Sequence, residues 1–162
     1  MMEIQNLVEL LRTNELLIAD IYRECEKLFP AFKDDFAVFV REEEAHAELF
    51  TKIAEDLKTG NSHWQKGKVS LITIEIVQKQ LKEVLAEIRS GKVAPRYAIT
   101  ALRSFEQGMS ERSIEKLVTI DSEVFKQATA EINKGFVTHL TRLQELEIKI
   151  FPRGDKERIF EI

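Results

Sequence analysis

The segment VREEEAHAELF, residues 40–50, contains a glutamate and a histidine at a spacing that could bind a metal ion. Glu43 and His46 are three residues apart, and residues at that spacing share one face of an α-helix. A carboxylate oxygen and an imidazole nitrogen can therefore reach one ion. Alone, the pair is also compatible with the solvated face of an acidic helix.

Apolar neighbours favour an inward position for this pair. Val40 and Phe50 lie three or four residues from Glu43 and His46, so the stripe that should face a core runs through both. The other charged residues of the segment are assigned to the solvated side: Arg41, Glu42 and Glu44.

Two more carboxylates interrupt apolar stripes. Glu15 lies between Leu11 and Ile18, and Glu106 lies between Leu102 and Met109. Burying an isolated charge costs several kcal/mol unless the charge is paired or binds a metal. The clustering therefore indicates a metal site.

A weak internal repeat adds a second histidine. At an offset of 93 residues, His46 pairs with His139 and Glu43 pairs with Phe136. The chain then consists of two helical hairpins, each with a histidine on its second helix. Chance similarity between two long helices of like composition is the alternative.

The first helices of the two hairpins align at an offset of 91. Glu15 then pairs with Glu106, and Tyr22 pairs with Ser113. Each hairpin therefore offers a glutamate on its first helix, although the second hairpin lacks the tyrosine.

Long helices must position these residues. The chain has 162 residues, enough for one domain, and its three prolines all lie between periodic segments. Gly108 and Gly135 lie inside periodic segments, where they should allow close helix approach. The pattern predicts an all-α domain over residues 1–150, with helices at 3–29, 33–58, 96–119 and 122–150, a connecting helix at 71–90 and a tail at 151–162. The tail could dock on the bundle or on a neighbouring subunit.

Composition argues against several classes of function. The net charge is −4, with both signs interspersed, so no nucleic-acid partner is expected. No apolar run is long enough for a membrane span and no leader is visible, so a cytoplasmic location is expected. Cys25 is the single cysteine, which excludes an internal disulfide and a Cys-x-x-Cys metal site in this chain.

Four segments together resemble a known metalloprotein family. NELLIADIY, REEEAHAELF, ALRSFE and FVTHL occur in this order, with a glutamate or a histidine in each. Ferritin-like proteins build a dimetal centre from a glutamate on each of two helices and a Glu-x-x-His on each of the other two. Over nearly its whole length, the chain resembles the rubrerythrin branch of this superfamily. The resemblance implies a ferritin-like antiparallel four-helix bundle with a helix in its long crossover connection.

The resemblance also implies an iron site and redox chemistry. The ligands would bind either a di-iron centre or a single divalent metal, and they are Glu15, Glu43, His46, Glu106 and His139. The expected activity is peroxide or oxygen reduction, or iron oxidation, with an external electron donor. A homodimer is expected, and no catalytic residue is assigned.

Two departures from the family pattern weaken these expectations. Phe136 stands where the pattern requires a glutamate, and no cysteine quartet exists for a rubredoxin-type iron site. The second metal position should therefore bind more weakly. The alternative function is a metal-free helical bundle that acts as a binding or assembly module, with Phe136 filling the vacated space.

Overall fold

The protein is all-α in a computed structural model, which describes residues 2–59, 63–67, 70–112 and 114–152. Its α-helices are α1 (Met2–Leu28), α2 (Lys33–Lys58), α3 (Leu71–Arg89), α4 (Pro95–Arg112) and α5 (Glu123–Ile150). The described part also contains two short 3₁₀ helices and two short strands. These are Pro30–Phe32, Ile114–Lys116, β1 (Trp64–Lys66) and β2 (Val118–Ile120).

Local sequence signals explain where several helices begin. The hydroxyls of Ser70 and Ser122 accept hydrogen bonds from backbone amides three residues later, and so cap α3 and α5. Pro30 opens the short turn between α1 and α2. Gly91 follows α3 with a φ of 69°, a left-handed conformation that glycine adopts without steric cost.

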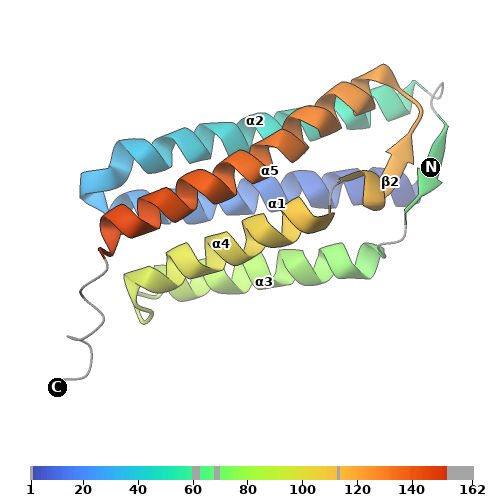
Figure 1. The fold of residues 1–162 in the computed structure, drawn as a ribbon. Helices are drawn as coiled ribbons and strands as arrows, with labels where there is room; N and C mark the ends of the chain where they lie inside the picture. The colour runs from blue at the N-terminus through green and yellow to red at the C-terminus, as the bar shows by residue number, and fades with distance from the viewer. Residues whose placement is uncertain (1, 60–62, 68–69, 113, 153–162) are drawn as a thin grey trace.

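Four of the helices enclose a common interior (Figure 1). α1 packs against α2, α2 against α5, α5 against α4, and α4 against α1. Helices α1 and α2 are antiparallel because a short turn joins them. α3 lies outside this ring, against α1 and α4.

The expected helix at 96–119 is wrong at its carboxyl end. α4 stops at Arg112, and the β-branched run Val118–Ile120 forms β2, which pairs antiparallel with β1. β1 itself lies where the sequence indicated only a loop. Both errors have one cause, because the pairing joins segments that are only three residues long and more than 50 residues apart.

Polar residues divide the hydrophobic core into two clusters. One contains the first half of α1, the second half of α2 and the first half of α5, including Leu11, Phe50 and Phe136. The other contains the opposite halves, including Tyr22 and Phe39. Buried charged residues lie in the layer between the two clusters, which we call the polar layer: Glu15, Glu43, His46, Glu106 and His139.

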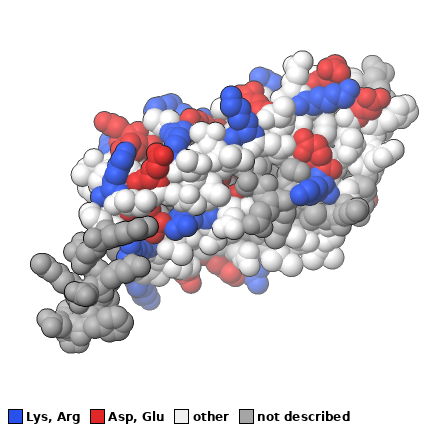
Figure 2. All heavy atoms as spheres, in the orientation of Figure 1, with Lys and Arg blue, Asp and Glu red and all other residues white. Residues whose placement is uncertain are grey.

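Charged side chains of both signs are mixed on the visible face of the molecule (Figure 2). On the face in Figure 2, Lys and Arg side chains alternate with Asp and Glu, without a large area of one sign. Within the described ranges, no helix combines the length and the apolar character needed to cross a membrane.

Candidate metal centre

The structure brings together all five ligands expected from the sequence. Four different helices supply the polar layer, near the midpoint of each, and every member is at most 5% exposed. Each side chain points inward because it replaces an apolar residue in the stripe of its own helix.

Glu43 lies between the two histidines. Its Oε2 atom is 3.4 Å from Nδ1 of His46, and its Oε1 atom is 2.7 Å from Nδ1 of His139. The two imidazole rings are stacked at an angle of 28°, with centroids 5.3 Å apart. One donor atom from each of these three residues lies within 4.8 Å of the others, which is close enough to share one ion.

The other two carboxylates flank this trio. Oε2 of Glu15 is 3.3 Å from Nδ1 of His46, and Oε1 of Glu106 is 3.5 Å from Nδ1 of His139. The buried hydroxyl of Tyr22 donates a 2.9 Å hydrogen bond to Oε1 of Glu106. In each histidine, Nδ1 therefore faces both Glu43 and one further carboxylate.

Protons balance part of the buried charge when no metal is bound. Burial opposes a charged imidazole, but the carboxylates Glu15 and Glu43 outweigh it and raise the pKa of His46 to about 10. The pKa of His139 rises to about 10 in the same way, through Glu106 and Glu43. Burial also raises the pKa of Glu15, because the charged carboxylate is desolvated.

Several donor atoms nevertheless lack a well-directed hydrogen bond. Both oxygens of Glu15, Oε1 of Glu43 and Nδ1 of His139 are buried without such a bond to the described residues. Oε1 of Glu43 and Nδ1 of His139 are close together but not aligned with each other. Buried polar atoms are rarely left in this state, so the donor set fits a divalent ion between them.

Helix α5 approaches His46 very closely. A Cβ atom at position 135 would overlap Cε1 and Nε2 of His46, so a larger residue there would require the imidazole ring to move. The expectation of close approach is confirmed for Gly135 and wrong for Gly108, where a Cβ would meet nothing within 4 Å.

Phe136 fills space beside the site. It is 1% exposed, and its ring meets the ring of His46 edge to face, with centroids 6.0 Å apart. An apolar side chain therefore occupies the position where the family pattern requires a carboxylate.

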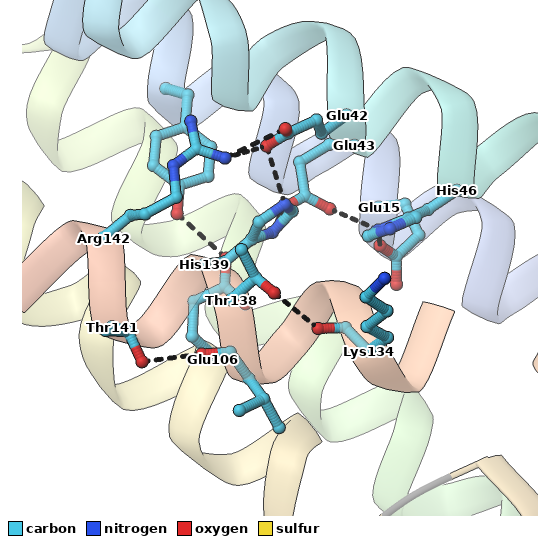
Figure 3. A network of polar contacts seen from close by, with 12 residues as sticks. Glu15, Glu42, Glu43, His46, Glu106, Lys134, Thr138, His139, Thr141 and Arg142 are labelled. Atoms are coloured by element: carbon cyan, nitrogen blue, oxygen red, sulfur yellow. Dashed lines mark hydrogen bonds and ion pairs between the residues drawn. The ribbon is translucent and has the colours of Figure 1, made fainter. Parts of the chain in front are cut away.

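Glu42 was assigned mainly to the solvated side and its side chain is 39% exposed, but it also contacts the site. Its Oε2 atom is 3.0 Å from Nε2 of His139, and it also forms an ion pair with Arg142 (Figure 3). The repeat gives this contact a counterpart in the other half of the site. At the offset of 93, Glu42 pairs with Gly135, which touches the equivalent nitrogen of His46.

Some positions with expectations from the sequence lie outside the described residues. Ser113, the counterpart of Tyr22, is one such position, and residues 153–162 of the tail are others.

Comparisons with protein-family models, curated proteins and solved structures found no match to this chain.

Proposed function

We propose that the chain is a rubrerythrin-like, metal-binding member of the ferritin-like superfamily, and that it binds one divalent metal ion. The observation that carries the proposal is the buried trio Glu43, His46 and His139, whose donor atoms lie within 4.8 Å of one another. Iron(II) is the first candidate, because two imidazoles and a carboxylate form a ligand set that suits it.

One ion fits this geometry better than two. The imidazole rings are only 5.3 Å apart, and Glu43 contacts both. Two divalent ions carry four positive charges, whereas Glu15, Glu43 and Glu106 supply three negative ones. A second bridging carboxylate is missing because position 136 is phenylalanine.

Within this site, the protein residues bind the ion and manage protons. Glu43, His46 and His139 would hold the ion, with Glu15 and Glu106 as further carboxylates. The histidines must lose the Nδ1 protons that they carry in the metal-free protein, so metal binding releases protons. Tyr22 fixes the orientation of Glu106 through its hydrogen bond.

Redox turnover is the second step of the proposal. A bound iron(II) ion would supply reducing chemistry for peroxide or oxygen. Reduction of one hydrogen peroxide to two waters consumes two electrons and two protons. Turnover at a one-ion site therefore requires an external electron donor.

One observation favours the alternative, a metal-free bundle that acts as a binding or assembly module. Phe136 packs into the polar layer, and the two histidines can neutralise nearby carboxylates by remaining protonated. In that case the polar layer is a self-compensating structural feature.

Metal analysis of protein purified without oxygen distinguishes the two functions. We expect about one equivalent of iron after iron(II) titration of the chelator-treated chain. His46→Gln and His139→Gln should each bind far less, because each removes a ligand. His63→Gln is the matched control, since His63 is exposed and outside the polar layer.

Two results would count against metal binding. Wild-type protein that holds less than about a tenth of an equivalent of any transition metal, and gains none on titration, has no site of useful affinity. Equal loss of metal in His63→Gln would show that binding is adventitious. Circular dichroism of each variant checks that the helices remain folded.

A further inference from the structure

The outward nitrogen of His139 faces a carboxylate that is not one of the proposed ligands. Nε2 of His139 lies 3.0 Å from Oε2 of Glu42, whereas Nδ1 faces the buried carboxylates of Glu43 and Glu106. Glu42 is partly exposed and His139 is buried. The contact therefore joins the polar layer to the protein surface (Figure 3).

Glu42 is itself held in place by a closed set of contacts. Nη1 of Arg142 lies 2.9 Å and 2.6 Å from its two oxygens. The guanidinium lies over the ring of Phe39, 4.5 Å from its centroid, and that ring meets His139 edge to face at 5.5 Å. Phe39 and Glu42 are three residues apart on α2, as are His139 and Arg142 on α5, so each helix presents its pair on one face.

The two histidines are positioned differently. His46 is confined by packing, because its Nε2 atom lies against Gly135. His139 instead has a polar partner on that nitrogen. Rotation of its ring about the Cβ–Cγ bond would move Nδ1 away from Glu43 and would break the contact with Glu42.

We propose that Glu42, anchored by Arg142, is a positioning residue for the metal centre. It accepts a hydrogen bond from Nε2–H of His139 and thereby holds Nδ1 toward Glu43 and Glu106, where the ion would bind. Partners of this kind fix the ring and the tautomer of metal-binding histidines. The metal part of this inference rests on the proposed function, but the contact between the two side chains is present in the metal-free protein as well.

The first experiment uses metal-free protein labelled with ¹⁵N-histidine. The chain has three histidines, so His46→Gln and His63→Gln assign the signals by elimination. We expect a slowly exchanging Nε2–H proton on His139 in the wild type. Glu42→Ala should lose it, and Glu48→Ala, an exposed glutamate on the same helix, should keep it.

The second experiment measures zinc(II) binding by calorimetry, with zinc as a diamagnetic probe. We expect Glu42→Ala to weaken affinity about 10- to 100-fold, the range typical of lost partners of metal-binding histidines. Glu42→Gln should lose less, because its amide oxygen can still accept the bond, and it guards against misfolding of the alanine variant. Arg142→Met should also weaken binding, because Glu42 then loses its anchor.

The outcomes separate this inference from the proposed function. Absence of a protected Nε2–H in metal-free wild type overturns the positioning role, as does a zinc affinity that Glu42→Ala leaves unchanged. Zinc bound through Nε2 of His139 overturns it too. A Glu42-dependent proton in a protein that binds neither zinc nor iron supports the hydrogen bond and overturns the metal function.

Discussion

Two positions matter most for the charge of the polar layer: Glu43, which supplies a carboxylate, and Phe136, which does not. Glu43 contacts both histidines, so among the described residues it is the carboxylate that links the two halves of the site. Phe136, its counterpart in the repeat, brings no ligand and no charge. In the proposed function, position 136 therefore decides how many metal ions the site would hold.

Substitution of Phe136 tests this dependence. We expect Phe136→Glu to raise the iron(II) stoichiometry above that of the wild type, because it restores a fourth carboxylate. Without metal the same variant should lose about 3 kcal/mol or more of stability, since an apolar contact is replaced by a buried charge. Phe136→Leu is the control that removes the ring without adding a ligand. A Glu variant that binds no more iron than the Leu variant would refute the alignment of the repeat.

At the scale of elements, the site requires α2 and α5 to approach closely at one point. The ring of His46 lies on the backbone of α5 where Gly135 has no side chain. Gly108 in α4 has no such contact, so it weakens its helix without a packing reason.

Two alanine variants compare these glycines. Gly108→Ala should increase stability, by up to about 1 kcal/mol, and leave metal binding unchanged. Gly135→Ala should displace the His46 ring and weaken zinc(II) affinity roughly tenfold or more. Denaturant titration and calorimetry measure both effects. Equal metal affinity in the two variants would show that the close approach has no role in binding.

At the scale of the whole molecule, the polar layer makes stability depend on pH. The imidazoles of His46 and His139 have a pKa of about 10 when folded, compared with the ordinary value of 6.5. Between these values the folded chain binds more protons than the unfolded chain. Their stabilisation is therefore fully present below pH 6.5 and is lost as the pH rises toward 10.

Denaturant titrations of chelator-treated protein at pH 6.5 and 9.5 measure this loss. We expect stability to fall with rising pH, by up to about 1.4 kcal/mol per pH unit for each histidine. His46→Gln should reduce the slope, and His63→Gln should not. The raised pKa of Glu15 acts in the same direction. Stability that stays constant or rises across this interval would contradict the buried charge pairs.

Much of the polar layer was predictable from local sequence. Glu15, Glu43 and Glu106 interrupt apolar stripes, and the helical period alone turns such residues inward. The ranges of α1, α2, α3 and α5 also agree with the expected helices to within a residue or two, because proline and serine signals mark their ends. His139 could be identified only through the internal repeat, because residue 136 is not a glutamate and His139 is therefore not part of a Glu-x-x-His motif.

Other features depended on how distant segments meet. Sequence determined which residues face inward, since that depends on the rotation of each residue about its own helix axis. Only the tertiary structure decided that α4 ends at Arg112, that Glu42 reaches His139, and that Gly135 touches His46. These contacts depend on the separation and relative rotation of helices, and on strand pairing across more than 50 residues, which no local periodicity encodes.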